Sequence, residues 1–379
     1  MTRLKIAVVT GTRPELIKLS VLIKLIKKDP EFKLIFIHSG QHYNNNLLSI
    51  FLQELELPNP DYDIQVGSHP DSVQTGNILI KLYDIIKKEK PHLIISEGDT
   101  NTVFAAALTA FKNFIPFGHV EAGIRSFDER MPEEINRKLS GVFALFNFAP
   151  TNISVKNLIN EGIKKERIYK VGNTIVDAVF ENLKLANKKS TILKKLNIEK
   201  NQKYVVLTAH RPSNVDHKKN LENIFITLKE LQDIKIVYPI HPRTKKNMIK
   251  FNLWENIKRS ENLKIIEPLG YLDMLYLMSN AYFILTDSGG LQEESVILKK
   301  PCLTLRYNTE RPESVEIGAN ILVGNDPKKI KYFVKKLWYE QDFYESMIPK
   351  LNPYGDGNSS NKIINIIKQK MNKLISFSN

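Results

Sequence analysis

Cysteine is nearly absent from this sequence of 379 residues, in which Cys302 is the only one. A single cysteine excludes an internal disulfide framework and a zinc site built from cysteine pairs. No apolar run approaches the roughly 18 residues typical of a membrane-spanning helix. The opening segment 1–14 has no small-residue cleavage site and ends in a Gly-Thr-Arg-Pro turn, unlike a signal peptide. We therefore expect a cytoplasmic protein with no membrane partner.

Two common nucleotide-binding fingerprints are also missing. The sequence contains no G-x-x-x-x-G-K-[ST] segment, which excludes a Walker P-loop, and no G-x-G-x-x-G segment. The second absence means that a nicotinamide or flavin cofactor of the Rossmann type is not indicated. We expect no cofactor and no metal ion.

Acidic residues are outnumbered by basic ones. The 41 Asp and Glu stand against 55 Lys and Arg, which gives a formal net charge of +14. The lysines are scattered in pairs along the chain, and no arginine-rich run or RNA-binding aromatic signature accompanies them. A solvated surface explains this pattern better than a nucleic-acid site does. We expect no nucleic-acid partner.

One pattern recurs along the chain. Short runs rich in Ile and Val end at Gly, Asp, His or Thr, and a segment with helical periodicity follows, as in 5–28 and 91–111. The pattern restarts after residue 170. Strands that alternate with helices predict parallel sheets covered by helices on both faces. Because the chain is also longer than one core usually allows, we predict an α/β protein of two doubly wound, Rossmann-like domains.

The boundaries of these domains follow from where the strands stop. We place the first domain at 1–170 and the second at 171–357, since the strands of the first pattern end shortly before the segment 169–179. The turn-rich segment 354–360 breaks the pattern again. The remainder, 358–379, contains an amphipathic stretch at 362–375, which predicts a terminal helix.

Polar residues of uncommon type follow the predicted strands. They fall in segments 11–15, 99–100, 119–123, 210–211 and 287–290 and at His241. In open α/β sheets, ligands bind at the carboxyl edge, where these residues lie. Asp99 or Asp287 alone would more often cap the next helix. Six such places on one edge favour a ligand site.

The segment 285–295, LTDSGGLQEES, predicts a phosphate-binding helix entry. Glycines at 289 and 290 let the backbone approach an anion, and a helix amino terminus offers free N–H groups. A plain helix entry fits the sequence about equally well. Glu293 and Glu294 could bind ribose hydroxyls or could simply form an acidic first turn.

The segment 119–137, HVEAGIRSFDERMPEEINR, concentrates carboxylates around a turn. It contains five of them: Glu121, Asp128, Glu129, Glu133 and Glu134. Their spacing is helical only after Pro132, so a solvated helix face does not account for the whole group.

Eight segments, in order, resemble those of the non-hydrolysing UDP-N-acetylglucosamine 2-epimerases. They are GTRPELIK (11–18), GQHY (40–43), GDTNTVFAAAL (98–108), the segment 119–137, VGNTIVDA (171–178), AHR (209–211), LTDSGGLQEES (285–295) and TERPESVEIG (309–318). The resemblance covers nearly the whole chain. It implies the GT-B architecture, in which two Rossmann-like domains face each other across a cleft that binds a UDP-sugar. It also implies a terminal helix that returns to the first domain, and a homodimer.

The resemblance implies reversible epimerisation of UDP-N-acetylglucosamine (UDP-GlcNAc) at C2, giving UDP-N-acetylmannosamine (UDP-ManNAc) for cell-surface polysaccharide. No carbonyl neighbours C2, so its proton is not acidic. Expelling UDP from C1 while a base removes that proton leaves 2-acetamidoglucal, to which UDP then adds back. This route needs a base and an acid on different faces of the sugar, and donors for the departing pyrophosphate.

Matching the motifs residue by residue gives the implied site. The catalytic candidates are Asp99, Glu121, Glu133, His210, Lys18 and Arg13. The candidates for UDP binding are Arg13, His210, Ser288, Gly289, Gly290 and Glu294, and further possible ones are His241, Arg211 and Gln41. We interpret Glu134 and Arg137 as a structural ion pair, Asp128 and Glu129 as exposed, and Arg306 and Arg311 as ordering the loop at 309–318.

Several alternatives stay open. A hydrolysing epimerase would release UDP and free N-acetylmannosamine, and relatives act on 2,3-diacetamido uronic acid sugars. A GT-B glycosyltransferase or a non-catalytic nucleotide-sugar module fits the carboxylates less well. Regulated relatives bind a second UDP-GlcNAc as an obligatory activator, partly through cationic side chains. The segment 61–76 here contains no Lys or Arg, so we expect no obligatory activation.

Overall fold

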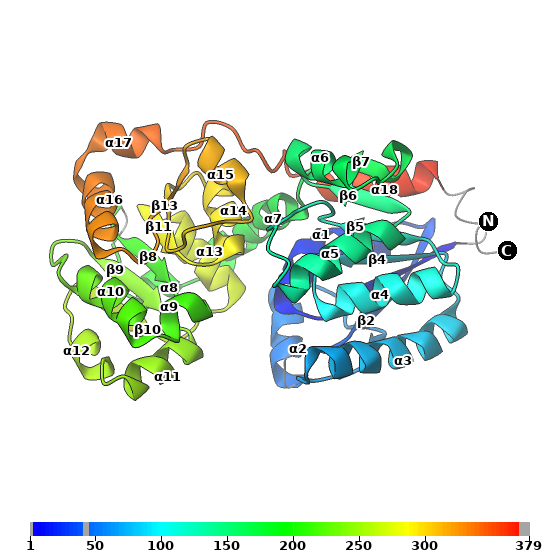
Figure 1. Ribbon diagram of the computed structural model, residues 1–379, viewed down its shortest axis with the longest axis horizontal. Coiled ribbons are helices and arrows are strands. Elements are labelled where there is room, and N and C mark those ends of the chain that lie inside the picture. Colours follow the sequence, from blue (N-terminus) through cyan, green and yellow to red (C-terminus); the bar gives the residue numbers. More distant parts are fainter. Residues whose placement is uncertain (1–2, 41–44, 200, 371–379) are drawn as a thin grey trace. The chain divides into compact units, whose positions relative to one another are not determined.

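A computed structural model describes residues 3–40, 45–199 and 201–370 (Figure 1). The chain forms two compact units. The first comprises the residues up to Glu181 together with those from Tyr354 onward, and the second runs from Asn182 to Pro353. Each unit contains one parallel sheet. The two α/β units therefore agree with the predicted fold class.

The sheet of the first unit has, within the described residues, the strand order β3-β2-β1-β4-β5-β6-β7. Its strands are β1 Leu4–Thr10, β2 Phe32–His38, β3 Tyr62–Asp63, β4 Leu93–Glu97, β5 Phe117–Val120, β6 Phe146–Ala149 and β7 Ile168–Lys170. Its helices are α1 Arg13–Lys28, α2 Asn45–Glu54, α3 Asp71–Glu89, α4 Asn101–Lys112, α5 Pro132–Phe143, α6 Asn152–Asn160, the 3₁₀ turn η1 Lys165–Arg167, α7 Thr174–Lys189, which crosses into the second unit, and α18 Ser359–Gln369. The central strands β1, β4 and β5 are neighbours, so the loops that follow them lie side by side.

The sheet of the second unit has the order β10-β9-β8-β11-β12-β13 among the described residues. Its strands are β8 Val205–Thr208, β9 Ile236–Pro239, β10 Leu263–Ile266, β11 Phe283–Thr286, β12 Cys302–Thr304 and β13 Asn320–Leu322. Its helices are α8 Ile192–Lys195, α9 Pro212–Val215, α10 Lys218–Lys229, α11 Pro242–Lys250, α12 Trp254–Lys258, α13 Tyr271–Ser279, α14 Gly289–Ile297, α15 Pro312–Glu316, α16 Pro327–Tyr339 and α17 Gln341–Ser346. Parallel pairing of β9, β8 and β11 brings the loops after these strands together.

Burial explains why the central strands are rich in Ile and Val. In β1, residues 6–10 are fully buried, because helices cover both faces of a parallel sheet. The helix α1 that follows has Pro14 in its first turn, where a missing N–H costs nothing. Its buried apolar residues Leu16, Leu19 and Ile23 recur every three or four positions, as a helix that packs on a sheet requires.

The terminal helix α18 packs against α1 within the first unit. Ile363 and Ile367 are buried, and the carboxylate of Asp177 accepts the backbone N–H groups of Ser359 and Ser360, at 3.1 and 2.8 Å. The helix begins before the expected residue 362, and the part of the expected stretch beyond 370 lies outside the described residues.

The boundaries of the two compact units differ from the domain boundaries that we expected. The divisions fall at 181/182, inside α7, and at 353/354, instead of 170/171 and 357/358. Residues 171–181 contact the first unit because α7 begins beside the loop at 354–360, where the N–H of Asn173 donates to the carbonyl of Tyr354 at 2.7 Å. The boundaries of independently folding domains stay a prediction.

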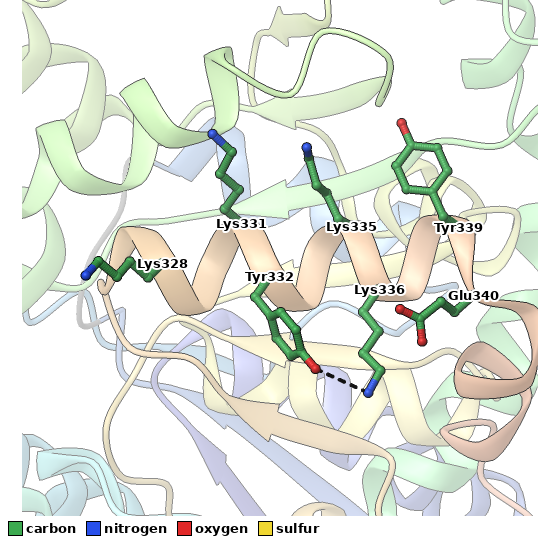
Figure 2. Close-up of a pocket in the computed structure, with 7 residues that line it drawn as sticks. All are labelled: Lys328, Lys331, Tyr332, Lys335, Lys336, Tyr339 and Glu340. Carbon is green, nitrogen blue, oxygen red and sulfur yellow. Dashed lines mark hydrogen bonds between the residues drawn. The ribbon is translucent and has the colours of Figure 1, made fainter.

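Several of the lysines lie on the outer surface of α16. On α16, the side chains of Lys331 and Lys335 project from one face of the helix, and Lys336 donates to the hydroxyl of Tyr332 at 3.4 Å (Figure 2). The opposite, buried side of α16 carries Ile330 and other apolar residues. This arrangement is that of a solvated amphipathic helix. Within the described residues, no helix has the length and apolar character needed to cross a membrane.

Candidate active site

The first half of the candidate site lies where β1, β4 and β5 end. Lys18 comes from α1, Glu97 is the last residue of β4, and Glu121 follows β5 directly. The Nζ atom of Lys18 lies 2.9 Å from an oxygen of Glu97 and also contacts the carboxylate of Glu121. Burial raises the pKa of Glu97 well above its ordinary value, and the neighbouring Glu121 raises it further against the opposing effect of Lys18. The three side chains form a buried charged cluster.

Glu121 has an unusual backbone conformation. Its φ of +66° lies in the left-handed region, which side chains other than glycine rarely adopt. Such strain persists only where the surrounding structure determines it, and it is common at functional sites. Beside it, the Nε2 atom of buried His119 lies 2.7 Å from the carbonyl of Gly98. Burial lowers the pKa of His119 to about 4, so its ring is neutral at pH 7.

Glu15 lies in the first turn of α1. Its carboxyl group accepts the N–H of Gly11 at 2.6 Å and the hydroxyls of Thr12 and Thr100 at 3.0 and 2.8 Å. Burial nevertheless raises the pKa of Glu15 to about 7, since these hydrogen bonds offset only part of the desolvation. Glu15 therefore links the loop after β1 to the loop after β4.

Asp99 is positioned by Arg137. One oxygen of its half-buried carboxylate accepts from both Nε and Nη2 of Arg137, at 2.9 and 2.6 Å. The third nitrogen of the same guanidinium donates to Glu134 at 2.7 Å, which confirms the predicted ion pair. Glu134 also accepts the N–H groups of Ser126 and Phe127, so the ion pair fixes the loop before α5. Arg137 thus connects that loop to a catalytic candidate.

The remaining candidates of the first unit are more exposed. Glu133 lies in the first turn of α5 with its side chain toward solvent, and Arg13 lies at the start of α1 over the ring of Phe51, 4.9 Å from its centroid. Glu129 is exposed as expected. Asp128 is only partly exposed because it pairs with Arg130 at 2.8 Å, which corrects our expectation for this residue.

In the second unit, Asp287 is the centre of the candidate site. It is fully buried at the end of β11, and its carboxylate accepts the N–H groups of His210 and Arg211 and the side-chain amide of Asn214. The Nδ1 atom of His210 lies 3.3 Å from it. Burial lowers the pKa of His210, although Asp287 opposes this. A fixed His210 ring beside a buried carboxylate is suited to hydrogen bonding or proton transfer.

His241 lies near His210, with the two ring centroids 5.3 Å apart. Its own Nδ1 atom accepts the N–H of Arg243 at 3.2 Å, which caps α11. The structure thus gives His241 a capping role, and it also places the exposed ring beside a catalytic candidate. Both interpretations of this residue remain compatible with its geometry.

The predicted phosphate site lies at the start of α14. Gly289 and Gly290 form its first turn, and the hydroxyl of Ser288 makes no capping hydrogen bond. A Cβ atom on Gly289 would lie 3.8 Å from Oε2 of Glu310, which is paired with Arg306, and 4.0 Å from Nη2 of Arg211. The buried Nε atom of Arg211 has no hydrogen-bond partner within the described residues. Uncapped N–H groups beside a cation suit a phosphate group.

Arginine–glutamate pairs order the neighbouring loop, as predicted. Arg306 binds Glu310 at 2.8 Å, and Arg311 binds the fully buried Glu293 at 2.8 Å. The arginine beside it lowers the pKa of Glu310 to about 2, despite burial. Glu293 is therefore a structural residue, while the largely buried Glu294 on the next position stays the candidate for the ribose.

Sequence reasoning missed Glu97 and the structural role of Glu15. Both lie in segments that the motifs cover or adjoin, and a carboxylate at the very end of a buried strand is a signal that could have found Glu97. Gln41 lies outside the described residues. No group of three or more His, Cys, Asp or Glu side chains is placed to bind a metal ion within the part of the chain that the structure describes.

Comparison with known proteins places these residues in context. A family model described as UDP-N-acetylglucosamine 2-epimerase matches residues 24–368. A Methanocaldococcus jannaschii protein named UDP-N-acetylglucosamine 2-epimerase is 47% identical over 368 residues, which cover 96% of this chain and 99% of the relative. A crystal structure of the epimerase from that organism, in complex with UDP-GlcNAc and UDP, matches with a TM-score of 0.85, covering 97% of this chain and 100% of that one.

A more distant relative acts on another sugar. A Pseudomonas aeruginosa protein named UDP-2,3-diacetamido-2,3-dideoxy-D-glucuronate 2-epimerase is 37% identical over 325 residues, covering 85% of this chain and 88% of the relative. The similarity is therefore greater to the protein named for UDP-GlcNAc.

Proposed function

The chain belongs to the UDP-N-acetylglucosamine 2-epimerase family, and on that basis we propose that it interconverts UDP-GlcNAc and UDP-ManNAc. The reaction is an isomerisation, in which UDP leaves C1, 2-acetamidoglucal forms and UDP adds back. The observation that carries the proposal is the set of carboxylates at the carboxyl edge of the first sheet, with Glu121 bound to Lys18 and Asp99 bound to Arg137.

These carboxylates supply the proton transfers. In the forward direction a base takes the C2 proton, the C–H electrons form the C1–C2 double bond, and the C1–O electrons leave with UDP. In the return step a proton reaches C2 from the opposite face while a UDP oxygen attacks C1. Asp99, Glu121 and Glu133 are the proposed acid and base groups, with roles that can exchange between the two directions.

The second unit supplies the binding of UDP. Ser288, Gly289 and Gly290 would bind the pyrophosphate through the N–H groups of α14, with Arg211 and His210 beside them, and Glu294 would bind the ribose. The uncapped start of α14 and the unpartnered Nε of Arg211 support this assignment. The expulsion of UDP is easier where such donors stabilise the developing charge. Arg13 and Lys18 are the proposed cations of the first unit.

A homodimer is the proposed assembly. On the neighbouring helices α3, α4 and α5, which Figure 1 shows side by side, and in the turn after α4, several large apolar side chains face solvent. Ile80 is 68% exposed, Phe111 55%, Phe114 80% and Val142 54%. Phe111 and Phe114 also line a surface hollow of about 390 Å³. An apolar patch of this kind is typical of a protein–protein interface.

The proposed location is the cytoplasm. The one cysteine, Cys302, is buried with a free thiol, and burial raises its pKa to about 11. Such a thiol is unreactive and is compatible with a reducing compartment.

Product analysis tests the proposed reaction against its two rivals. The purified protein is incubated with UDP-GlcNAc, and the products are separated by chromatography and identified by NMR. We expect UDP-ManNAc as the minor species at equilibrium and no requirement for added cofactor. Free N-acetylmannosamine with UDP as the main products would assign the protein to the hydrolysing class. If the protein converted a UDP-2,3-diacetamido uronic acid sugar but not UDP-GlcNAc, the proposed substrate would be wrong.

A further inference from the structure

The cluster of Lys18, Glu97 and Glu121 contains one more carboxyl group than its ammonium can neutralise. The side chains of Glu97 and Glu121 are only 2% and 7% exposed, and Lys18 contacts both. If both carboxyl groups were ionised, the cluster would carry a net charge of −1 away from water, which is strongly unfavourable. One proton on the pair removes that charge.

Among the described residues, the groups near Glu97 other than Lys18 are neutral or acidic. From α1 come Lys18 and Glu15, and the pKa of Glu15 is itself raised to about 7. On β5, His119 is neutral at pH 7, because burial lowers its pKa to about 4. The turn after β4 adds Asp99, an acidic group.

Within the described part of the chain, the charged side chains of the other elements packed against β4 lie far from Glu97. In β1 the one charged residue is Lys5, at the far end of the strand, where its Nζ donates to the carbonyl of Glu89 at 2.8 Å. In α4 the one charged residue is Lys112, the last residue of the helix. Among the described residues, the cation that acts on Glu97 is therefore Lys18.

We infer that Glu97 is a positioning residue, which carries the shared proton, donates it as a hydrogen bond to Glu121 and, with Lys18, keeps the Glu121 carboxylate ionised and in one orientation. Glu97 is the more deeply buried of the two, and its side chain is in hydrogen-bond contact with that of Glu121. Glu121 has a left-handed backbone, with a φ of +66°, and its carboxylate is held by these two contacts.

The catalytic consequence rests on the proposed function, in which Glu121 exchanges a proton with C2. Below the raised pKa of Glu97, the pair holds one proton and Glu121 is ready to act. Above it, Glu97 loses the hydrogen-bonding proton, the two carboxylates repel each other, and turnover falls. Glu97→Gln keeps a donor at the same place but cannot lose a proton, so this fall should disappear.

Infrared spectroscopy tests the shared proton without any turnover. At pH 7, the difference spectrum between the wild-type protein and Glu97→Gln should contain the carbonyl stretch of a protonated carboxyl group. The control is Glu129→Gln, which removes a carboxylate whose side chain is 75% exposed and should show only carboxylate bands. Carboxylate bands alone for Glu97→Gln would overturn the inference, and this result does not depend on which reaction the protein catalyses.

A titration of the wild-type protein covers the case in which Glu97→Gln does not fold. With glutamate labelled by ¹³C at its carboxyl carbon, NMR should show two carboxyl groups that stay protonated far above the ordinary pKa of about 4.3. One is Glu15, which Glu15→Gln identifies by its disappearance. Only one such signal in the wild-type protein would contradict a proton on Glu97.

The pH profile of kcat tests the catalytic role. At pH 7, Glu97→Gln should turn over within about threefold of wild type, and Glu97→Ala, which removes the contact to Glu121, should lose about 10²-fold through misplacement. The acid limb of the Glu97→Gln profile should match that of wild type, while its alkaline limb should move to higher pH. Superposable profiles for wild type and Glu97→Gln would overturn the positioning role.

Discussion

The carboxyl groups of the first unit differ in what binds them, and these contacts determine what each can do. Asp99 is bound by a guanidinium through two nitrogens, which keeps it in one orientation. Glu121 lies against an ammonium and a second carboxyl group. Glu133 lies in solvent at the start of α5. A reaction that needs a base on one face and an acid on the other can use such unequal groups.

Substitution of these residues separates catalysis from binding. We expect Asp99→Asn, Glu121→Gln and Glu133→Gln each to reduce kcat by about 10²-fold or more, the usual scale for acid–base groups. The affinity for UDP, measured by calorimetry, should change much less, because the proposed phosphate donors lie in the second unit. Glu129→Gln serves as the matched control and should be nearly silent. Near-normal turnover by Glu133→Gln would remove that residue from the catalytic set.

The sequence indicated some of the candidate site residues and missed others. Motifs pointed to Asp99, Glu121 and His210, and the structure places all three just after a strand, while their catalytic roles stay a prediction. Glu97 was missed because its importance depends on Lys18, which lies 79 positions away along the chain. Likewise, the buried carboxylate of Asp287 suggested a helix cap, whereas the structure shows it binding the backbone of His210 and Arg211. A contact between residues that lie far apart along the chain leaves no pattern in the sequence around either residue.

At the level of elements, the site depends on turns that connect strand to helix. Glu15 joins the turn before α1 to Thr100, which caps α4. The strands predicted from the sequence all lie in the interior of their sheets. The edge strands β3, β7, β10 and β13 and the interior strand β6, which pairs with β7, were not predicted. They are only two to four residues long, and so short a segment shows no clear periodicity.

The turn at Glu15 should make stability depend on pH. Its pKa is raised from 4.5 unfolded to about 7 folded, so the native state binds more protons between these values. By linkage, this residue's contribution to the free energy of unfolding falls as pH rises from 4.5 to 7, by on the order of 3 kcal/mol. We expect the fall to be missing in Glu15→Gln when unfolding by urea is measured across this range. Parallel pH dependences in the two proteins would contradict the raised pKa.

Gly123, in the turn after β5, should not tolerate a side chain. Its φ is +86°, and an added Cβ atom would lie 2.3 Å from the carbonyl oxygen of Ser154. We expect Gly123→Ala to destabilise the protein by clearly more than about 1 kcal/mol in urea unfolding. Gly162 has a similar φ of +83° and nothing within 4 Å, so Gly162→Ala measures the backbone strain alone. Equal losses in both variants would mean that the turn can shift.

At the scale of the whole molecule, the predicted α/β class with two parallel sheets is confirmed, and membership of the epimerase family supports the GT-B architecture. The cleft between the units stays a prediction, as does the absence of obligatory activation by UDP-GlcNAc. The net charge of +14 is carried largely by surface lysines such as those of α16. The amino-acid composition therefore indicates the charge of the surface, whereas the order of the strands determines which residues lie together in the candidate site.

The apolar patch on α3, α4 and α5 predicts the oligomeric state. We expect the wild-type protein to sediment as a dimer in analytical ultracentrifugation, and Phe111→Glu combined with Phe114→Glu to give a monomer, because charges would be buried without partners. Leu351→Glu is the control, since Leu351 is equally exposed, at 78%, but lies in the second unit. A monomeric wild-type protein at micromolar concentration would exclude the proposed interface.

The reaction in D₂O tests the central claim most directly. The claim is that protein carboxylates remove the C2 proton of UDP-GlcNAc and return a solvent-derived one after UDP has left and re-added. When the purified protein is incubated with UDP-GlcNAc in D₂O and followed by ¹H NMR, we predict UDP-ManNAc that carries deuterium at C2, with the C2 proton signal lost from the recovered UDP-GlcNAc as equilibrium is reached. Formation of UDP-ManNAc that fully retains the original C2 proton would contradict the account.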